Sequence, residues 1–402
     1  MLLLLSLACD PTTETVDPDA VLYNEHVAPI LQERCVGCHQ EGAIGPFGLE
    51  DYAQVSVLAN QVLDSVESRR MPPYLADASG ECNTYLDAAW LSDEEIQTLA
   101  DWVEGGSLEG DPLAHPGAPD VELDLEGVTH SLVLEEVDVD FSSSDDNYRC
   151  FVVDPGLEED GFLTAFEVLP GNPAIVHHMI VYAPSSDAAL ADAYALDDAD
   201  TEPGYQCFGD ARVDSSMLAP WAPGTQSWHF PEGTGVRMTA GRPVVVQMHY
   251  NNGSQDSSDA TVVNLKVEES VETELYPFFW VDGSLNIPPG ESAHVEESSR
   301  SLGVQVPLKL WAVAPHMHKL GVAEQGWIEH ADDSETCLLD VPRWDFNWQL
   351  TYVFEEPVII QPEDRIGMRC TYDSTSVTET TNWGDGTGDE MCLMTMFASV
   401  AD

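Results

Sequence analysis

The chain has 402 residues, with 72 Asp and Glu against 14 Lys and Arg and a formal net charge of −58 at pH 7. This charge argues against nucleic acid and anionic membrane surfaces as partners, because phosphate groups are bound by Lys and Arg. The hydrophobic fraction of 43% is typical of a folded chain, and the length suffices for two or three domains.

The chain begins with MLLLLSLACD, a short apolar run that ends at a small residue and Cys9. The run is too short to span a bilayer, and it resembles the end of a bacterial lipoprotein signal with Cys9 as the lipidated residue. It has no basic stretch before the apolar run. We expect residues 1–19 to be a signal or lipoprotein-like leader and tether. The protein would then be exported, to the periplasm or to the cell surface on a lipid anchor.

The stretch RCVGCHQ contains C-x-x-C-H at Cys35, Cys38 and His39, the pattern of c-type haem attachment. The two thiols add to the haem vinyl groups, and His39 ligates the iron. A redox C-x-x-C would need a βαβ context, and a zinc site would need a second Cys/His pair nearby. Neither context is present in the sequence.

Residues 20–110 have apolar residues at helical spacing on both sides of this motif, which predicts an α-helical haem domain. In DEEIQTLADWVE, a helix should begin after Ser92, with Glu95 completing a capping box, and end at Gly105. Met71, in RRMPPY, is held extended by the prolines and is the candidate sixth haem ligand. This arrangement resembles bacterial class I cytochrome c domains and implies one covalently bound haem c.

A Pro/Gly-rich linker at residues 111–122 separates this domain from a chain of different texture. Short runs rich in Val, Thr, Tyr and Phe alternate there with Gly, Pro, Asp and Ser turns, which is typical of all-β structure. We expect two β-sandwich or jelly-roll domains, at residues 123–265 and 266–402. The predicted fold is therefore multidomain, a small α-helical domain followed by two all-β domains.

Five histidines lie on the predicted strands: His177, His178, His249, His316 and His318. In AVAPHMHKL the two histidines alternate, so both rings of a regular strand would point to one face as a two-ligand metal clip. The adjacent pair in AIVHHMIVYA would face opposite sides. That pair could share a metal only through a local distortion or by using different ring nitrogens.

A third ligand for the H-x-H clip is available in GDEMCLMTMF, where Met391 stands beside Cys392. A disulfide between Cys392 and Cys370 would pin the backbone of Met391. A thioether with two imidazoles suits copper, above all Cu(I).

The motifs HHM, QMHY, HMH and DEMC, in this order, resemble the copper type II, ascorbate-dependent monooxygenases, which include peptidylglycine α-hydroxylating and dopamine β-monooxygenases. The resemblance implies two jelly rolls and two copper sites separated by a solvent cleft. It assigns the electron-transfer copper to His177, His178 and His249. It assigns the copper that activates O2 to His316, His318 and Met391.

The resemblance also implies a reaction, in which one oxygen atom of O2 enters an aliphatic C–H bond of a small organic substrate. The two electrons come from a reductant, ascorbate or another donor. A fused cytochrome offers a high effective concentration of a one-electron carrier. We hypothesise that the haem, reduced by an electron-donor protein, feeds the His177/His178/His249 copper.

The family pairs cysteines at the positions of Cys150 and Cys207, and the Cys370–Cys392 bridge would be a second disulfide. Cys82 and Cys337 are left over, either free or bridging the modules. This cysteine use implies an oxidising compartment.

Peptide-oxidising members hold the substrate carboxylate with an Arg, an Asn and a Tyr. The corresponding positions in this chain are Ala314, Leu393 and Thr395. The carboxylate clamp is therefore missing, and a peptidylglycine substrate is not expected. An apolar pocket near Leu393 would suit a less polar substrate.

Two other functions use the same residues. A non-catalytic exported haem and copper carrier would bind copper without forming an O2-dependent product. A zinc hydrolase would need a carboxylate ligand or base beside the histidines, which the apolar flanks of the H-x-H clip do not offer.

Overall fold

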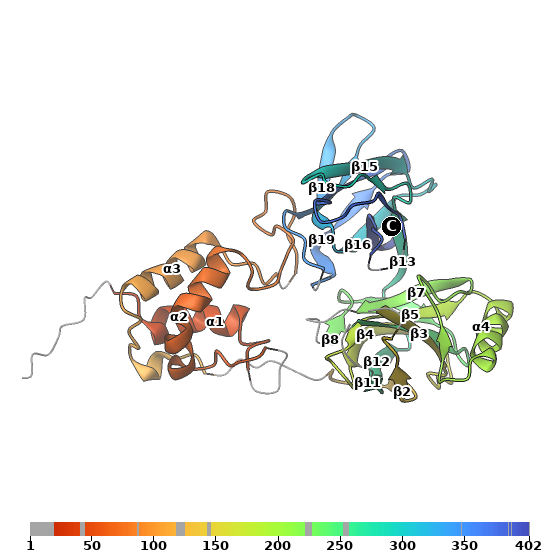
Figure 1. The fold of residues 1–402 in the computed structure, drawn as a ribbon, viewed down its shortest axis with the longest axis horizontal. Helices are drawn as coiled ribbons and strands as arrows, with labels where there is room; N and C mark the ends of the chain where they lie inside the picture. Colours follow the sequence, from red (N-terminus) through yellow and green to blue (C-terminus); the bar gives the residue numbers. More distant parts are fainter. Residues whose placement is uncertain are drawn as a thin grey trace, which may run out of the picture. The chain divides into compact units, whose positions relative to one another are not determined.

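The structure is a computed structural model, and its contacts divide the chain into two compact units. The helical unit comprises Met1–Pro72 and Leu91–Asp120, and the β unit comprises Pro73–Trp90 and Val121–Asp402 (Figure 1). The described residues are 20–40, 45–86, 88–117, 125–142, 146–221, 227–251, 257–346, 348–384, 386 and 388–401. The predicted leader and Cys9 lie outside them.

The helical unit contains η1 (Tyr23–Val27), α1 (Ala28–Arg34), α2 (Tyr52–Glu67) and α3 (Asp93–Glu104), in the stretches where the sequence predicts helices. A short 3-10 helix, η2 (Pro112–Ala114), lies in the predicted linker. At the start of α3, the Ser92 hydroxyl accepts from the Glu95 N–H at 3.1 Å, and the Glu95 carboxylate accepts from the Ser92 N–H at 2.7 Å. The helix ends at Glu104, before Gly105. The predicted capping box and helix end are confirmed.

The helices pack around a small core of side chains that are at most 2% exposed: Tyr23, Leu31, Val55, Leu99 and Trp102. Burying one such side chain stabilises a fold by about 1.5–3 kcal/mol. The indole of Trp102 also donates to the Leu108 carbonyl at 3.0 Å, which ties the chain after α3 back to the core. Within the described part of the chain, no helix has the length and hydrophobicity to cross a membrane.

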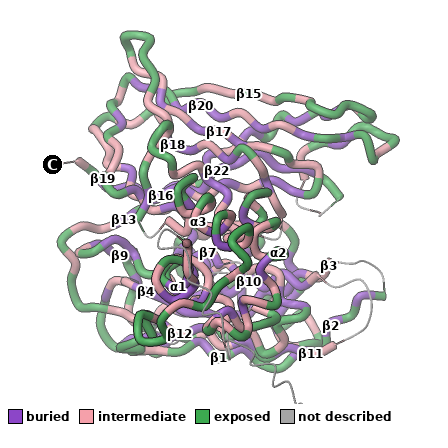
Figure 2. Tube along the Cα trace, turned by 90° about the vertical axis from the view of Figure 1, so that its left-hand side faces the viewer, coloured by how far each residue is buried: buried purple, intermediate pink, exposed green. Residues whose placement is uncertain are grey.

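The N-terminal half of the β unit is a sandwich of two sheets with its core between them. Figure 2 shows buried stretches of the β unit in purple along its strands. One sheet has the order β1 (His130–Val133), β12 (Val262–Glu268), β4 (Gly161–Leu169) and β9 (Thr234–Met238), with β8 (Ser227–His229) on β4. The other has the order β6 (Tyr205–Gln206), β3 (Asp146–Val153), β10 (Val244–Asn251), β5 (Val176–Pro184) and β7 (Ser215–Trp221). Smaller elements are the pair β2 (Val137–Val139) and β11 (Ser257–Asp259) and the helix α4 (Asp187–Ala199).

The C-terminal half is a second sandwich with its own core. One sheet has the order β13 (Thr273–Val281), β22 (Leu393–Val400), β16 (Leu308–His316) and β19 (Tyr352–Ile360). The other has the order β15 (His294–Ser301), β20 (Arg365–Tyr372), β17 (Gly321–Glu329) and β18 (Glu335–Val341). A short pair, β14 (Asn286–Ile287) and β21 (Thr381–Asn382), completes it. The prediction that the second module is built of β-sandwiches is confirmed.

One sheet is continuous through both halves, because β13 pairs in parallel with β9 and antiparallel with β22. The boundary that the sequence placed between residues 265 and 266 falls inside β12, whose partners β1 and β4 both belong to the N-terminal half. The chain therefore leaves that half only after Glu268.

Residues 73–90, which we call the strap, pack with the β unit although the sequence placed them in the haem domain of residues 20–110. Leu75, Ala76 and Tyr85 of the strap are at most 3% exposed in the core of the C-terminal half. The apolar burial explains the difference, since these side chains complete a core that lies far away in sequence. The strap is the orange loop beside β18 and β19 in Figure 1.

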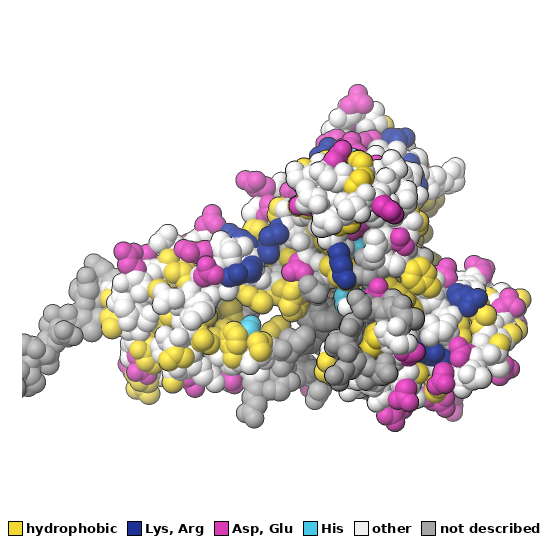
Figure 3. Space-filling model, in the orientation of Figure 1, with side chains coloured by type: hydrophobic (Ala, Val, Ile, Leu, Met, Phe, Trp, Pro, Cys, Tyr) yellow, Lys and Arg dark blue, Asp and Glu magenta, His cyan; other side chains and the backbone are white. Residues whose placement is uncertain are grey.

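Most of the described acidic residues lie on the surface, and Glu324 and Glu390 are among the few that are buried. On the face drawn in Figure 3, magenta Asp and Glu side chains are scattered around a few blue Lys and Arg side chains. This distribution is that of a solvated acidic surface.

Candidate metal centres

The first cluster combines His177 and His178 on β5 with His249 on β10. His249 pairs with His178, and the next pair joins Tyr250 to Val176, so His177 is an extra residue in β5. Such a bulge sets two consecutive residues opposite one partner and re-aims their side chains. It supplies the local distortion that two adjacent histidines need to face one point.

The facing atoms are the Nδ1 nitrogens of the three rings. His178 Nδ1 lies 3.3 Å from His177 Nδ1 and 3.1 Å from His249 Nδ1. One ligand nitrogen from each ring lies within 4.8 Å of the other two. Nitrogens that bind one ion at about 2 Å lie roughly 3–3.5 Å apart. The spacing therefore suits a single metal ion held by three imidazoles.

Burial keeps these imidazoles neutral. It lowers the pKa of His177 to about 3 and the pKa of His178 well below the ordinary range, with His249 as a further cause at both. The pKa of His249 is also lowered by burial, against the opposing effect of Asp146. Neutral imidazoles at pH 7 offer lone pairs to a metal without first releasing a proton.

The outer nitrogen of His249 is held by Asp146. His249 Nε2 lies 2.9 Å from Asp146 Oδ1, which also accepts from Asn251 Nδ2 at 2.7 Å. The His249 ring stacks on Tyr148 with centroids 4.1 Å apart. These contacts fix the tautomer with Nδ1 toward the cluster. The sequence did not indicate Asp146 or Tyr148, because their position depends on how β3 pairs with β10.

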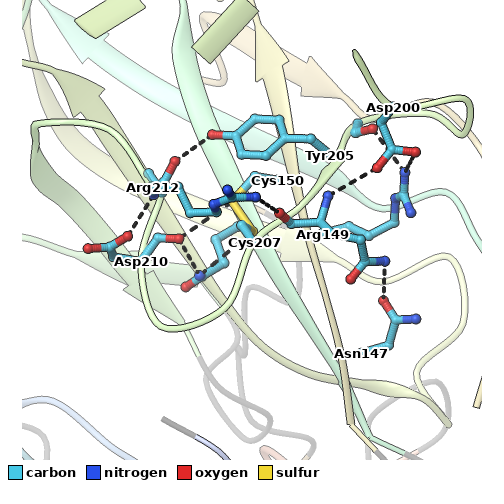
Figure 4. Close-up of a disulfide and its surroundings, with 12 residues drawn as sticks. Asn147, Arg149, Cys150, Asp200, Tyr205, Cys207, Asp210 and Arg212 are labelled. Atoms are coloured by element: carbon cyan, nitrogen blue, oxygen red, sulfur yellow. Dashed lines mark hydrogen bonds and ion pairs between the residues drawn. A yellow bond between two sulfur atoms is a disulfide. The ribbon is translucent and has the colours of Figure 1, made fainter. Parts of the chain in front are cut away.

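The Cys150–Cys207 disulfide, which the resemblance implied, fixes β3 beside this cluster (Figure 4). The buried guanidinium of Arg149 supports the same corner. It donates to the Gly204 carbonyl at 2.9 Å and lies 3.2 Å from Asp200. The edge of β3 that carries Tyr148 is thereby held in place.

The second cluster lies where β16 ends and β22 begins. His316 is the last residue of β16 and pairs with Leu393, the first residue of β22, while Met391 lies just before that strand. The rings of His316 and His318 have centroids 5.1 Å apart and are nearly perpendicular. The structure places His316, His318 and Met391 on the wall of one cavity.

The rings of this cluster are oriented the opposite way from those of the first. His316 Nδ1 donates to Gln349 Oε1 at 2.7 Å, and His318 Nδ1 donates to the Asp389 carbonyl at 3.1 Å. Both Nε2 nitrogens are then left as metal ligands. Burial lowers the pKa of His316 to about 3 and also lowers the pKa of His318.

A buried carboxyl group, Glu390, holds the backbone of this cluster. It accepts from the N–H groups of Leu320 at 2.6 Å, His318 at 2.9 Å and Met391 at 3.2 Å. Burial raises the pKa of Glu390 to about 7, against these hydrogen bonds. The apolar flanks of the H-x-H clip offer no carboxylate in sequence, but the fold brings Glu390 beside it. The oxygens of Glu390 are occupied by backbone N–H groups.

A disulfide fixes the position of Met391. Cys370 and Cys392 are bonded as predicted, and the Tyr372 hydroxyl donates to the Met391 carbonyl at 2.8 Å. The two leftover cysteines, Cys82 and Cys337, are also bonded to each other. Among the described cysteines, this leaves the C-x-x-C pair without a disulfide.

The cavity beside the clusters has a volume of about 540 Å³. Aromatic side chains form much of its wall: Tyr148, Phe208, Trp221, Trp228, Phe279 and Trp383. Ala314, Leu393 and Thr395 also line it, and no Lys or Arg does so among the described residues. The wall therefore offers apolar surface and no cationic group for a substrate carboxylate.

Phe346 contacts one ring of each cluster. Its centroid lies 4.7 Å from that of His177, in a stacked arrangement, and 5.9 Å from that of His318. The cavity is lined by His178 of the first cluster and by His316 and His318 of the second, and the Phe346 ring lies against one ring of each cluster. Nothing in the local sequence singled out Phe346.

In the helical unit, His39 is oriented in the way a haem ligand requires. Its Nδ1 lies 3.1 Å from the Phe47 carbonyl, which leaves Nε2 available to iron. Burial and the neighbouring Cys38 raise the pKa of the Cys35 thiol to about 12. A redox C-x-x-C would need a lowered thiol pKa, so the raised pKa of Cys35 does not favour disulfide exchange at this pair.

Met71 lies on the turn after α2, where its N–H donates to the Ser65 carbonyl at 3.1 Å. Its side chain is half-buried. Pro72 follows it, and the strap begins at the next residue.

Known proteins match the β unit over both halves. Residues 131–257 match the N-terminal domain of the copper type II ascorbate-dependent monooxygenases, and residues 279–397 match their C-terminal domain. The two matches together cover more than half of the chain. The chain therefore belongs to the copper type II ascorbate-dependent monooxygenase family.

Individual relatives are distant. DBH-like monooxygenase protein 1 of Gallus gallus is 27% identical over 65% of this chain and 45% of its own length. Peptidyl-glycine alpha-amidating monooxygenase A of Xenopus laevis is 26% identical over 70% of this chain and 28% of its own. Putative DBH-like monooxygenase protein 2 of Homo sapiens is 26% identical over 71% of this chain and 59% of its own. The chain thus spans less than two thirds of each of these relatives.

Proposed function

We propose that this protein hydroxylates an aliphatic C–H bond of a small organic substrate with O2. The reaction consumes one O2, two electrons and two protons, and it yields an alcohol and water. Two bound copper ions would supply the electrons and the place where O2 is reduced. One observation carries the proposal, an all-imidazole cluster and a second cluster of two imidazoles and a thioether beside one cavity.

The two clusters suit different tasks. His177, His178 and His249 present three neutral Nδ1 nitrogens, which can hold both oxidation states of copper and so pass electrons on. His316 and His318 would bind copper through Nε2, and the soft sulfur of Met391 favours Cu(I). Cu(I) is the form that reacts with O2. The opposite ring orientations of the two clusters support this division.

The wall of the cavity indicates the substrate class. Ala314, Leu393 and Thr395 stand where the peptide-oxidising relatives carry their carboxylate clamp, and they line the cavity here. A buried carboxylate without a partner is strongly disfavoured. The proposed substrate therefore carries no carboxylate group, and much of its surface is apolar to match the aromatic wall.

A covalently bound haem c is the proposed electron donor. Cys35 and Cys38 would bind its vinyl groups, with His39 and Met71 as iron ligands. The covalent link to the β unit keeps the donor at a high effective concentration. Ascorbate would then not be required. Replacing Met71 or His39 should slow turnover with a protein donor and spare it with a small reductant.

The three disulfides fit an exported protein, because such bonds persist in oxidising compartments. We propose export through the leader, with Cys9 as a lipid anchor in the periplasm or on the cell surface.

Labelled O2 tests the function. The copper-loaded, reduced protein is supplied with matched alkyl compounds that differ only in ending in a methyl group or in a carboxylate. Label should enter the neutral compounds, and Met391→Ala should abolish incorporation while the haem absorbance is retained. Copper binding with no labelled product from any neutral compound would instead favour a carrier of copper and electrons.

A further inference from the structure

The strap is built into the C-terminal copper domain as an extra edge segment. Tyr85 forms an antiparallel bridge with Phe354 of β19, the last strand of its sheet. Leu86 N–H donates to the Val353 carbonyl at 2.8 Å, and Glu355 N–H donates to the Thr84 carbonyl at 3.2 Å. The strap thus covers an edge that would otherwise expose unpaired backbone groups.

Covalent and polar contacts hold the strap on β18 as well. Cys82 is disulfide-bonded to Cys337 of that strand. Asn83 Nδ2 donates to the Cys337 carbonyl at 3.1 Å, and Asp77 N–H donates to the Asp340 carbonyl at 2.7 Å. These contacts fasten the strap to the C-terminal half of the β unit independently of the helical unit.

Aromatic rings link the strap to β19. The ring of Tyr74 packs edge-on against Tyr352 with centroids 5.1 Å apart, and Tyr85 packs on the same ring at 5.5 Å. Tyr352 is 1% exposed, and its hydroxyl oxygen accepts from the Ala76 N–H at 3.3 Å. The contact between the strap and β19 is therefore buried at Tyr352 and includes a hydrogen bond.

From Tyr352 a short stretch of backbone reaches the second cluster. Gln349, three residues earlier, accepts from His316 Nδ1 at 2.7 Å. Thr351 and Gln349 line the same cavity as His316 and Met391. A connected path of bonds and contacts thus runs from Tyr74 to a copper ligand through Tyr352 and Gln349.

The other end of this path is the predicted haem ligand. Met71 is joined to Tyr74 by two prolines, Pro72 and Pro73, and the helical unit ends at Pro72. The sulfur that would bind the haem iron therefore lies on the same short peptide as the ring that packs on Tyr352.

We propose that the strap is the electron path from the haem to the copper of His316, His318 and Met391, with Tyr74, Tyr352 and Gln349 as its intermediate contacts. One electron leaves the ferrous haem iron, which becomes ferric, and reduces Cu(II) at that cluster to Cu(I). No bond or proton changes place. The inference rests on the proposed haem and copper sites. It directs the electron to the copper of the second cluster, whereas the sequence suggested the copper of His177, His178 and His249.

The test follows the haem absorbance in the full chain after a light pulse reduces the haem through a flavin semiquinone. Two variants each retain one copper site. His249→Ala retains the second cluster, and His318→Ala retains the first cluster. Reoxidation of the haem should stay fast in His249→Ala, with parallel loss of the Cu(II) paramagnetic signal. It should slow by about an order of magnitude or more in His318→Ala. Fast reoxidation in His318→Ala alone, or equal rates in both, would overturn the path.

A matched pair of variants tests the path itself. Tyr352→Leu and Phe354→Leu each remove a buried ring of β19 that contacts Tyr85, and the ring of Tyr352 also packs on Tyr74. Haem reoxidation should slow in Tyr352→Leu and stay near the wild-type rate in Phe354→Leu. Equal slowing in the two variants would overturn the role of Tyr352. A lower haem reduction potential in Tyr352→Leu would overturn it too, because the ring would then act by changing the ligation of iron by Met71.

The outcomes also separate this inference from the function on which it rests. A chain that binds no haem or no copper shows no transient, and the proposed sites then fail together with the path. A chain that shows the transfer but never labels a substrate keeps the path and loses the monooxygenase.

Discussion

At the scale of single residues, one hydrogen-bond partner decides which ring nitrogen each histidine offers. Asp146 occupies Nε2 of His249 and leaves Nδ1, whereas Gln349 occupies Nδ1 of His316 and leaves Nε2. Outer partners of this kind fix the tautomer and raise the basicity of the ligand. The difference between the two clusters is therefore set by residues that would not touch the metal.

Asp146→Asn tests this effect. The amide can still accept from His249 Nε2 but carries no charge, so copper affinity at the first cluster should fall by about 10- to 100-fold. Chelator competition measures this affinity, and Asp154→Asn, an exposed residue just past the other end of β3, is the control for lost charge. Equal affinities for the two variants would contradict the role of Asp146.

The lowered histidine pKa values predict how the metal-free protein responds to acid. Unfolded histidine takes up a proton near pH 6.5, whereas folded His177 does so only near pH 3. Between these values the unfolded state binds more protons, so stability falls as pH drops from about 6.5 toward 3, by up to about 1.4 kcal/mol per pH unit for this histidine.

Denaturant unfolding of the metal-free protein at pH 7 and pH 5 measures this loss. His177→Asn removes the titrating group, so the difference between the two pH values should shrink in the variant. An unchanged difference would mean that His177 is not neutral in the folded state.

At the scale of elements, the sequence predicted what depends on local pattern. The Ser92 capping box, the end of α3 and the β texture follow from neighbouring residues and were confirmed. The sequence indicated that His177 and His178 would need a local distortion, or different ring nitrogens, to share a metal, but it did not place a bulge at His177. Its position depends on pairing with β10, about seventy residues away in the chain. Asp146 and Phe346 escaped prediction for the same reason, since only tertiary packing brings them to the histidines.

Two disulfides lie beside the two clusters and make a matched pair. Replacing Cys370 and Cys392 by Ser should cost about 2–4 kcal/mol of stability and weaken copper binding at the Met391 cluster. Replacing Cys150 and Cys207 should weaken the first cluster instead, because that bond holds β3. Denaturant unfolding and copper content check both variants. Loss of the same copper in both would contradict this assignment.

At the scale of the whole molecule, the chain does not divide into modules in simple succession. The helical unit is interrupted by the strap, which the Cys82–Cys337 bond fastens to the β unit. Sequence texture could not show this, because Leu75, Ala76 and Tyr85 form no periodic strand and are buried only by distant residues. The resemblance to the family depended instead on four short motifs, each of which contributes at least one residue to the wall of one cavity.

The metal content of the matured protein, compared with that of His249→Ala and Met391→Ala, is the most direct test of the two copper sites. We expect one iron and two coppers per chain. His249→Ala should lose the first copper and Met391→Ala should lose or weaken the second, with iron unchanged in both. One iron with zinc, or with a single copper that neither substitution affects, would contradict the two copper sites and the function built on them.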